Sequence, residues 1–366
     1  MDLFNTKSIL RERRTLWIDY DKGISILLVG YGHSFAILQG HGLNFEAYPL
    51  FNYIGVFLYG FRMPLFFIIS GLLIGKSLHK KGLSGYISSR ANNILHPLII
   101  WGFIEVSIKI LTKGSGTENG SYLMDYLNLL IDPRKTGIFW YLNALFCIGV
   151  IYSFVKSVFK ISASKQILCG FVLYSISAYI HLNDINGGFF TDIFQYYIFF
   201  AIGDFISRVI LSDKSAGWLT SAWVFFPLLF IFIITQYYFT QINLQPNSTG
   251  MTFVERKLPF LFLIEALIGC ALSMSVSFLL QKYKLFTFLR VVGFHSLFIY
   301  CMQIIVMNFI RISASTLLKI DNIPLLFLIT WSLGTIIPML IYNLSMRLNL
   351  WWLYTFNKTA KVEDKR

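Results

Sequence analysis

Two ionisable side chains stand eleven residues apart in an apolar stretch near the start of the chain, LWIDYDKGISILLVGYGHSFAIL. They are Lys22 and His33. If the stretch is a helix, eleven steps of 100° turn His33 about 20° past three full turns from Lys22, with a separation of about 16 Å along the axis. A neutral imidazole can take a proton from a hydroxyl group, and an ammonium can hold an anion. The spacing therefore predicts proton-transfer and anion-binding chemistry at two depths of one helix face.

Each of these residues alone has a simpler interpretation. Lys22 can extend to lipid headgroups, and His33 can be a hydrogen-bonded interior histidine. Because both lie on one face, we favour a polar route along it. Asp19, one turn before Lys22, is placed to orient its ammonium. Three glycines of the same stretch leave room for another helix or a ligand: Gly23, Gly30 and Gly32.

Two arginines mark the next apolar runs. Arg62 and Pro64 lie in YGFRMPLFFIISGLLIGKS, where Pro64 predicts a kink within a helix over 50–75. A guanidinium keeps its proton, so Arg62 needs a carboxylate, an anionic ligand or water. Arg90 belongs to a basic cluster, completed by Lys22, Lys76, Lys80 and Lys81, that suits either lipid headgroups or the phosphates of a nucleotide-type donor.

Acidic residues are few within the apolar runs. Glu105 and Lys109 are spaced to form an ion pair along one helix. Asp204 and Glu265 have no partner that the sequence indicates. Phosphate-binding glycine loops, zinc motifs and nucleophile elbows are absent from the sequence, and we expect no metal.

The composition defines the class of protein that must position these groups. The chain has 366 residues, of which 56% are hydrophobic and 13% charged, and a net charge of +13. Soluble domains carry roughly a quarter charged residues, about twice this share. Disordered and nucleic-acid-binding proteins also need more polar residues than this chain has, so both classes are excluded. The four cysteines lie in apolar runs, which predicts neither disulfides nor a zinc site, and no cleaved signal peptide is apparent. These features indicate a polytopic membrane protein.

Runs of about 20 apolar residues, the length that crosses a bilayer, predict an all-α bundle of about ten transmembrane helices. The spans expected are about 16–38, 50–75, 92–112, 137–155, 166–182, 190–210, 217–236, 258–280, 290–313 and 323–346. Lys and Arg concentrate in alternate connecting segments, which predicts both termini in the cytoplasm. We therefore expect a basic cytoplasmic N-terminus (1–15), a transmembrane domain (16–346) and a basic cytoplasmic tail (347–366).

Four sequence blocks resemble the membrane acyltransferase-3 family of bacterial integral membrane O-acyltransferases, nearest to its fucose and polysaccharide O-acetyltransferase branch. They are IDYDKGISILLVGYGHS (18–34), FRMPLFFIISGLLIG (61–75), SSRANNILHPLIIW (88–101) and FWYLNALF (139–146). Weaker likenesses are YYIFFAIGDFI (196–206) and LRVVGFHSLFIYCMQ (289–303). The first block contains the basic-x10-His pattern of the family as Lys22 and His33.

The resemblance implies transfer of an acyl group, usually acetyl, from cytoplasmic acyl-CoA to a carbohydrate hydroxyl on a surface or lipid-linked glycan. It implies that His33 is the catalytic histidine and that Lys22 and Arg90 hold the donor, in a bacterial inner membrane and next to glycan assembly machinery. Arg62 and Gln303 stand where relatives often have histidine, and neither can act as a base. We assign Arg62 to the stabilisation of a developing oxyanion.

Two other functions fit the same features. A glycan-lipid flippase or a small-solute transporter would also use ten spans with interior polar residues and a broken helix near Pro64. No pair of matching halves is visible in the sequence, which weighs against transport. A non-catalytic subunit of a glycan export complex is the third possibility, since Arg62 and Gln303 depart from the pattern of the family.

Overall fold

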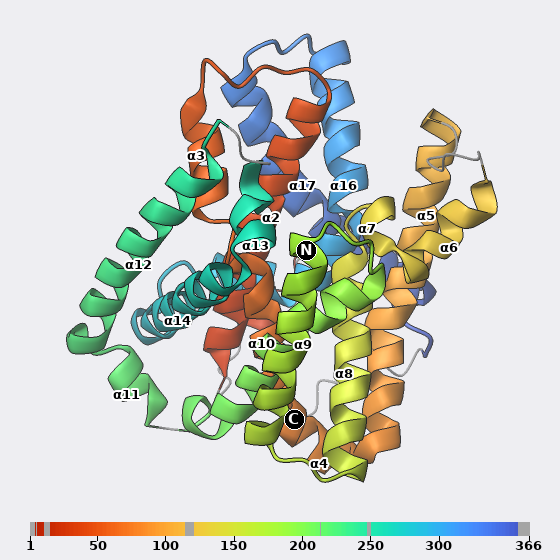
Figure 1. Ribbon diagram of the computed structural model, residues 1–366. Helices are drawn as coiled ribbons and strands as arrows, with labels where there is room; N and C mark the ends of the chain where they lie inside the picture. The colour runs from red at the N-terminus through yellow and green to blue at the C-terminus, as the bar shows by residue number, and fades with distance from the viewer. Residues whose placement is uncertain are drawn as a thin grey trace. The chain divides into compact units, whose positions relative to one another are not determined.

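The computed structural model describes residues 4, 6–10, 15–113, 121–212, 214–246 and 250–357. Within these ranges the chain forms helices and no strand (Figure 1), which confirms the predicted all-α class. The chain divides into two compact units. The first comprises Met1–Phe66 and Val209–Leu344, and the second comprises Phe67–Arg208 and Ser345–Arg366.

The first unit is built from the two ends of the sequence. Its helices, in chain order, are α1 (Thr6–Ile9), α2 (Leu16–Gly40), α3 (Pro49–Phe57), α11 (Ser215–Leu219), α12 (Ala222–Asn243), η2 (Gly250–Thr252), α13 (Phe253–Lys257), α14 (Pro259–Tyr283), α15 (Phe288–Phe294), α16 (Ser296–Ile312), η3 (Ser313–Leu317) and α17 (Ile323–Arg347). It also holds the first turn of α4 (Arg62–Arg90), because the boundary between the units falls after Phe66.

The second unit holds the remainder of α4 and the helices of the middle of the chain. These are the π-helix η1 (Ala91–Leu95), α5 (His96–Lys113), α6 (Tyr122–Ile131), α7 (Pro133–Thr136), α8 (Trp140–Val158), α9 (Ala163–Leu182), α10 (Phe189–Ile210) and, near the end of the chain, η4 (Trp351–Leu353).

Among the described residues, eight helical segments are long and apolar enough to cross a membrane. They are Leu16–Gly40, Pro49–Thr112, Trp140–Val158, Phe189–Ile210, Ala222–Asn243, Pro259–Tyr283, Ser296–Leu317 and Ile323–Arg347. With the apolar composition, they make the chain a multi-pass membrane protein. The count differs from the predicted ten for two reasons: Pro49–Thr112 contains two of the predicted spans, and α9, which matches 166–182, is not apolar enough to qualify.

The segment Pro49–Thr112 has 64 residues, about three times the length needed for one crossing. Gly82 interrupts it with φ 66° and ψ 179°, a conformation that a residue with a side chain rarely adopts. Across this break, Lys81 Nζ on one side donates a hydrogen bond of 2.7 Å to Ser89 Oγ on the other. The predicted spans 50–75 and 92–112 therefore lie on opposite sides of Gly82.

Two predicted helices are divided where the sequence did not indicate it. The span over 50–75 is broken between α3 and Arg62, and Pro64 lies in the first turn of α4, where no backbone N–H is needed, so the predicted kink at Pro64 is wrong. The span over 290–313 is divided at His295, between α15 and α16. His295 Nδ1 donates to Val291 O at 2.8 Å, and its Nε2 accepts from Asn343 Nδ2 at 2.9 Å.

Helix α2 is the central element of the first unit and packs against α3, α14, α15 and α16. Its approach to α15 depends on two glycines. A methyl group added at Gly23 would overlap the carbonyl of Leu289, and one at Gly293 would overlap the carbonyl of Asp19. The predicted close helix contact at Gly23 is thus confirmed.

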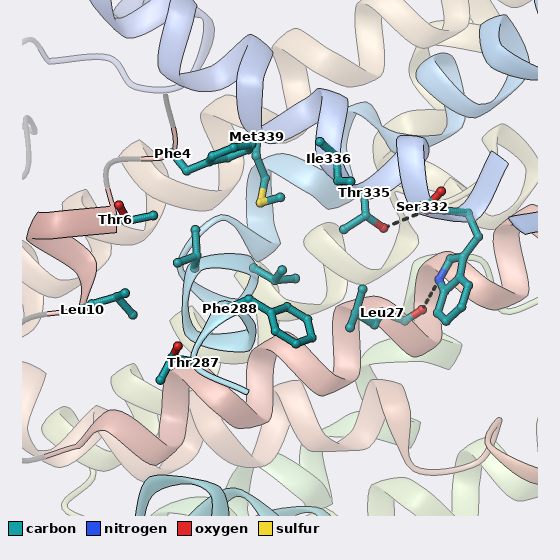
Figure 2. Close-up of a pocket in the computed structure, with 13 residues that line it drawn as sticks. Phe4, Thr6, Leu10, Leu27, Thr287, Phe288, Ser332, Thr335, Ile336 and Met339 are labelled. Carbon is teal, nitrogen blue, oxygen red and sulfur yellow. Dashed lines mark hydrogen bonds between the residues drawn. The ribbon is translucent and has the colours of Figure 1, made fainter. Parts of the chain in front are cut away.

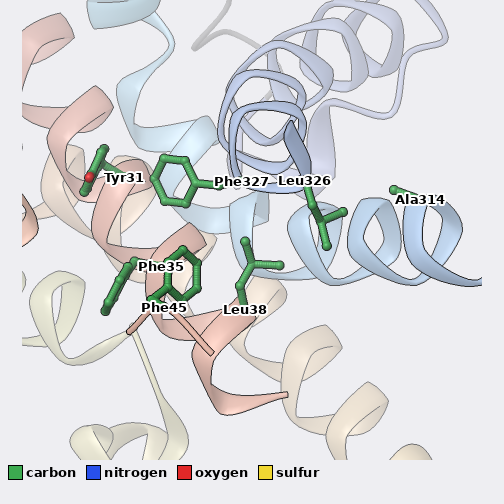
Figure 3. Close-up of a cluster of buried hydrophobic side chains, with 7 residues drawn as sticks. All are labelled: Tyr31, Phe35, Leu38, Phe45, Ala314, Leu326 and Phe327. Atoms are coloured by element: carbon green, nitrogen blue, oxygen red, sulfur yellow. The ribbon is translucent and has the colours of Figure 1, made fainter. Parts of the chain in front are cut away.

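The C-terminal half of α2 packs into an aromatic cluster with the loop after it and with α17 (Figure 3). The rings of Tyr31 and Phe327 meet edge to face at 4.8 Å, and those of Phe35 and Phe45 lie 4.7 Å apart. Such rings bury large apolar areas and have preferred mutual orientations, so they determine which way the neighbouring residues of α2 face.

Candidate functional site

His33 lies on α2 opposite α16. It is partly buried, and its Nδ1 is inaccessible and has no hydrogen-bond partner among the described residues. Its ring lies 6.4 Å from the ring of Tyr300, measured between centroids. A buried imidazole nitrogen without a partner is uncommon, because burying an unsatisfied polar atom costs free energy. The imidazole therefore has a nitrogen available to a ligand or to water.

Arg62 is brought to the same part of the first unit by the start of α4. Its Nη1 donates to the carbonyl of Leu28 at 3.1 Å, and its guanidinium carbon lies 4.8 Å from the centre of the Tyr59 ring. A methyl group added at Gly32 would overlap the guanidinium group, so the absence of a side chain there makes room for it. The structure thus places the Arg62 guanidinium beside Gly32, the residue that precedes His33 on α2.

Two buried carboxylates contact the residues just before Arg62. The hydroxyl of Tyr59 donates to Glu255 Oε2 at 2.5 Å, and Glu255 is buried. Glu265, also buried, contacts the amide of Gln236, and a methyl group at Gly60 would overlap its carboxylate. Sequence reasoning identified Glu265 without its partner and missed Tyr59, Glu255 and Gln236. Only Gln236 had a signal, an amide inside the predicted span 217–236.

Gln303 is completely buried on α16, one turn from Tyr300. Neither its Oε1 nor its Nε2 has a hydrogen-bond partner among the described residues. It faces Gly30, one turn before His33: a methyl group at Gly30 would lie 3.5 Å from Gln303 Oε1 and 3.5 Å from Trp331 Cδ1. The contact of Gly23 with Leu289 near the start of α2, and the sharing of one buried cluster by Leu38 and Ala314 near its end, show that α2 runs parallel to the segment formed by α15 and α16.

Lys22 is partly buried nearer the start of α2, and Asp19 lies close enough for the two charges to interact. The face between Lys22 and His33 is occupied by Ile26 and Val29, which are buried. The polar groups on this face therefore lie at two depths separated by hydrocarbon, and no unbroken polar line joins them along α2.

Asp21, which the sequence analysis passed over, is completely buried beside Lys22 in the chain. Its Oδ1 accepts hydrogen bonds from Ser273 Oγ at 2.6 Å and from Ser277 Oγ at 3.1 Å, both on α14. These bonds fix α14 against α2. Asp21 contributes to packing around the site, and its position explains why two serines lie on one face of an apolar helix.

Arg90 belongs to the second unit. Its Nη2 donates to the carbonyl of Leu145 at 2.5 Å and its Nη1 to the hydroxyl of Tyr86 at 3.0 Å, while Gly149 leaves room for the guanidinium. The side chain is 9% exposed. Two of its three nitrogens are therefore engaged within the protein, and Nε is buried without a partner.

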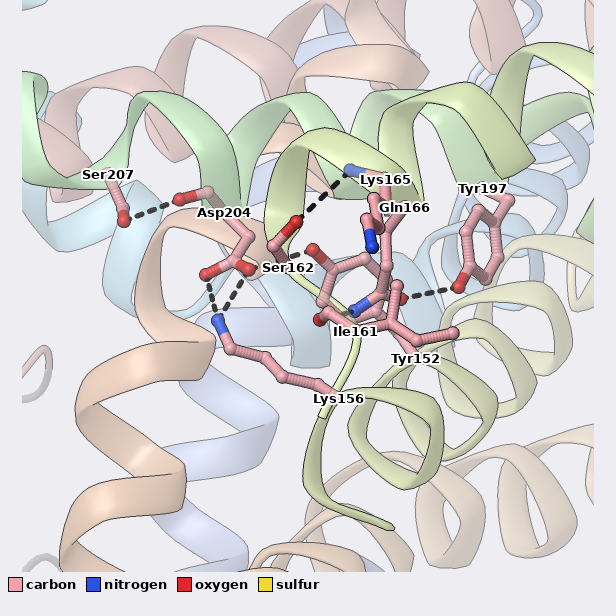
Figure 4. A network of polar contacts seen from close by, with 9 residues as sticks. All are labelled: Tyr152, Lys156, Ile161, Ser162, Lys165, Gln166, Tyr197, Asp204 and Ser207. Atoms are coloured by element: carbon pink, nitrogen blue, oxygen red, sulfur yellow. Dashed lines mark hydrogen bonds and ion pairs between the residues drawn. The ribbon is translucent and has the colours of Figure 1, made fainter. Parts of the chain in front are cut away.

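The second unit also contains the partner of Asp204. Lys156 on α8 forms an ion pair with the Asp204 carboxylate, which also accepts a hydrogen bond of 2.7 Å from the Tyr152 hydroxyl (Figure 4). Nearby, Tyr197 donates to Gln166 Oε1 at 2.7 Å (Figure 4). The predicted pair between Glu105 and Lys109 is confirmed at 2.5 Å. The contacts of Asp204 and Tyr197 connect α8, α9 and α10, whereas the Glu105–Lys109 pair lies within α5.

An apolar pocket of about 630 Å³ lies in the first unit between α1, α2, α15 and α17 (Figure 2). Leu27, Phe288, Trp331 and Met339 are among its lining residues. The indole of Trp331 donates to the carbonyl of Leu27 at 3.0 Å, so its polar atom is already used. The lining offers almost no groups for phosphates or sugar hydroxyls, and we place neither the nucleotide nor the sugar there.

Among the residues that the structure describes, no group of three or more His, Cys, Asp and Glu side chains could hold a metal ion. The chemistry available in the first unit is that of a histidine, a fixed arginine and buried amide and carboxylate groups inside a membrane-spanning bundle. This set suits proton transfer next to a stabilised negative charge.

The profile of the acyltransferase-3 family, described as an acyltransferase domain, matches residues 15–355. The chain therefore belongs to this family, as the four sequence blocks predicted. No solved structure matches the chain significantly.

Three curated proteins are similar to the chain over part of its length. Nodulation protein NolL of Sinorhizobium fredii is 28% identical over 200 residues, 54% of this chain and 50% of that protein. NolL of Mesorhizobium japonicum is 29% identical over 227 residues, 60% and 54% of the two chains. Inner membrane protein YcfT of Escherichia coli is 28% identical over 184 residues, 45% and 49% of the two chains. The match spans about half the length of each relative.

Proposed function

We propose that this protein transfers an acyl group, acetyl in the simplest case, from cytoplasmic acyl-CoA to a hydroxyl of a surface or lipid-linked carbohydrate. The observation that carries the proposal is the Arg62 guanidinium held at Gly32, next to His33, whose Nδ1 has no partner among the described residues, inside a chain that belongs to an acyltransferase family. A sugar hydroxyl is a poor nucleophile, so it needs a base, and the attacked carbonyl needs a partner for its negative charge.

In the proposed reaction His33 accepts the proton of the acceptor hydroxyl while the hydroxyl oxygen attacks the thioester carbonyl. A carbon–oxygen bond forms, the carbon–sulfur bond breaks, and the imidazolium returns the proton to the departing thiolate, so that an ester and free CoA result. Arg62 stabilises the negative oxygen of the tetrahedral intermediate. Because Gly32 admits the guanidinium next to α2, this positive charge is in place before the reaction begins.

We assign donor binding to Lys22, which is oriented by Asp19 and whose charge would meet the phosphates of CoA. The guanidinium of Arg90, the other predicted donor residue, is engaged by Leu145 and Tyr86 within the second unit. Lys22 and Asp19 are on α2, toward the cytoplasm in the proposed orientation. The donor needs no metal in this scheme. The chemistry ends with CoA, an acylated carbohydrate and an unchanged enzyme.

We place the protein in a bacterial inner membrane with both termini in the cytoplasm. The multiple spanning segments and the similarity to an inner membrane protein of Escherichia coli support the location. The excess of Lys and Arg in alternate connecting segments supports the orientation. The acceptor would then meet the site from the outer side or from the lipid phase, next to the machinery that assembles glycans.

Membranes that contain the protein should transfer label from radiolabelled acetyl-CoA to carbohydrate. His33→Gln keeps a side chain of similar size but removes the base, so transfer should fall by about 100-fold or more, in line with the contribution of a general base. His41→Gln is the matched control, because His41 is exposed at the end of α2. Equal amounts of each variant in the membrane exclude an effect on insertion.

Full activity of His33→Gln would remove His33 from the mechanism. If the unaltered protein moves no label from acetyl-CoA or succinyl-CoA, acyl transfer is contradicted. Movement of a glycan lipid or small solute across vesicles would then support the transporter alternative.

A further inference from the structure

Gln303 differs from Gln166 and Gln236, which are equally buried, in the hydrogen-bond partners of its amide. Its side chain has no exposed surface, and neither end of its amide has a partner among the described residues. By contrast, Gln236 contacts Glu265, and Gln166 accepts from Tyr197. An unsatisfied buried amide costs free energy, so folded proteins nearly always provide it with a partner or with water. This amide is available to a ligand.

The amide lies beside the proposed base. Gln303 is one turn from Tyr300 on α16, and Gly30, which it faces, is one turn from His33 on the neighbouring α2. One turn of three residues is about 4.5 Å along a helix axis. The His33 Nδ1 is likewise buried without a partner. Two unsatisfied polar side chains therefore occupy neighbouring turns of one helix interface.

A glutamine amide suits one role in the reaction proposed above. It donates hydrogen bonds without carrying a charge and without taking part in proton transfer. In a site that excludes water, a donor held in place for a developing oxyanion lowers the barrier without reorganising. Gln303 cannot replace a histidine as a base, but it can bind the oxygen on which negative charge appears.

We propose, building on the acyl transfer proposed above, that Gln303 binds the carbonyl oxygen of the acyl thioester through its Nε2–H. As the acceptor oxygen attacks, the carbonyl becomes an oxyanion, and the amide hydrogen bond strengthens. When the carbon–sulfur bond breaks, the oxygen returns to a carbonyl in the product ester. His33 carries the proton from the acceptor to the thiolate, and Gln303 carries none.

The first test compares Gln303→Met with Gln236→Met in the purified full-length protein. Methionine has the length of glutamine but no amide. Removing one donor to an oxyanion lowers kcat by about 100- to 1000-fold, and we expect that loss for Gln303→Met. Its melting temperature should stay level or rise, because an unsatisfied buried amide is lost. Gln236→Met should lower the melting temperature, because it leaves the buried Glu265 carboxylate without its amide partner.

The second test fills the space that Gln303 faces. Gly30→Ala adds a methyl group at 3.5 Å from Gln303 Oε1 and from Trp331 Cδ1, an ordinary contact distance, so the protein should fold normally. The methyl group should nevertheless separate the amide from the thioester and lower kcat. Gly40→Ala is the matched control on the same helix, since nothing lies within 4 Å of its added methyl group.

The third test measures binding of the thioester carbonyl in the absence of turnover. An acetyl-CoA analogue with CH2 in place of the thioester sulfur keeps the carbonyl and cannot transfer its acyl group. It should raise the melting temperature of the unaltered protein more than CoA does, because CoA has no carbonyl. This difference should disappear in Gln303→Met.

Several outcomes would overturn the inference. Unchanged kcat in Gln303→Met, with an active unaltered protein, would contradict the role of Gln303 alone and leave acyl transfer intact. A loss of kcat with a fall in melting temperature as large as that of Gln236→Met would show a structural role instead. An unaltered protein inactive with both acetyl-CoA and succinyl-CoA would contradict the proposed function and this inference together.

Discussion

Arg62 shows how the absence of a side chain on a facing helix, at Gly32, can position a charged group in a bundle. Its guanidinium occupies the place of a side chain at Gly32, donates to Leu28 O at 3.1 Å and lies over the Tyr59 ring. A lysine has the same charge but neither the planar fork nor the stacking surface. The position therefore depends on geometry as much as on charge.

Gly32→Ala should displace the guanidinium without removing it. The added methyl group meets the end of a flexible side chain, which can move, so we expect normal folding and a loss of acyl transfer of about 100-fold, as for the loss of one group that stabilises an oxyanion. Rates and melting temperatures of Gly32→Ala and Gly40→Ala, measured side by side, check this. Equal rates in the two variants would rule out Arg62 as the stabilising cation.

At the scale of the elements, α2 and α15 touch backbone to backbone. Gly23 lies against Leu289 and Gly293 against Asp19, so neither position has room for a side chain. The contact brings α15 against the part of α2 that carries Asp19, Asp21 and Lys22. The predicted span over 290–313 is divided just after this contact, where α15 ends at Phe294 and α16 begins at Ser296.

Gly293→Ala should therefore destabilise the first unit. Because the added methyl group meets backbone atoms that cannot rotate away, we expect a cost of at least about 1–3 kcal/mol, the usual size for overpacking. Denaturant or thermal unfolding in detergent measures it. Gly217→Ala is the control, since nothing lies within 4 Å of its methyl group, and similar stabilities of the two variants would disprove the close contact.

At the scale of the whole molecule, the proposed orientation rests on the distribution of charge, and the break at Gly82 makes it testable. If Pro49–Thr112 crosses the membrane on both sides of Gly82, Ser84 lies in the cytoplasm. Glu46 and Lys135, which precede and follow this pair of crossings, then lie outside. All three residues are exposed in the structure.

Single cysteines at these positions, in a background without the four native cysteines, test the arrangement in intact cells. A membrane-impermeant thiol reagent should label Glu46→Cys and Lys135→Cys directly, and Ser84→Cys only after permeabilisation. Direct labelling of Ser84→Cys would contradict the orientation. Labelling of Glu46→Cys and Lys135→Cys from opposite sides would contradict the pair of crossings.

The sequence by itself determined the class of the protein, the approximate position of most helices and the family. These follow from local properties: the length of apolar runs, the scarcity of charge, and short blocks such as residues 18–34. The i,i+4 pair Glu105–Lys109 was predictable for the same reason, because one helix turn brings the two residues together. The break at Gly82 falls in the basic segment that separates the predicted spans 50–75 and 92–112, whereas the division at His295 had no signal in the sequence.

The tertiary structure alone decided which polar groups meet. The Arg62 guanidinium reaches α2 beside His33 because Gly32 leaves space for it, and Gln303 faces Gly30 because α16 packs against α2. The periodicity of α2 placed Lys22 and His33 on one face, yet it could not show that Ile26 and Val29 fill that face between them. Contacts between distant segments depend on the packing of whole helices, and the sequence of one helix does not contain that information.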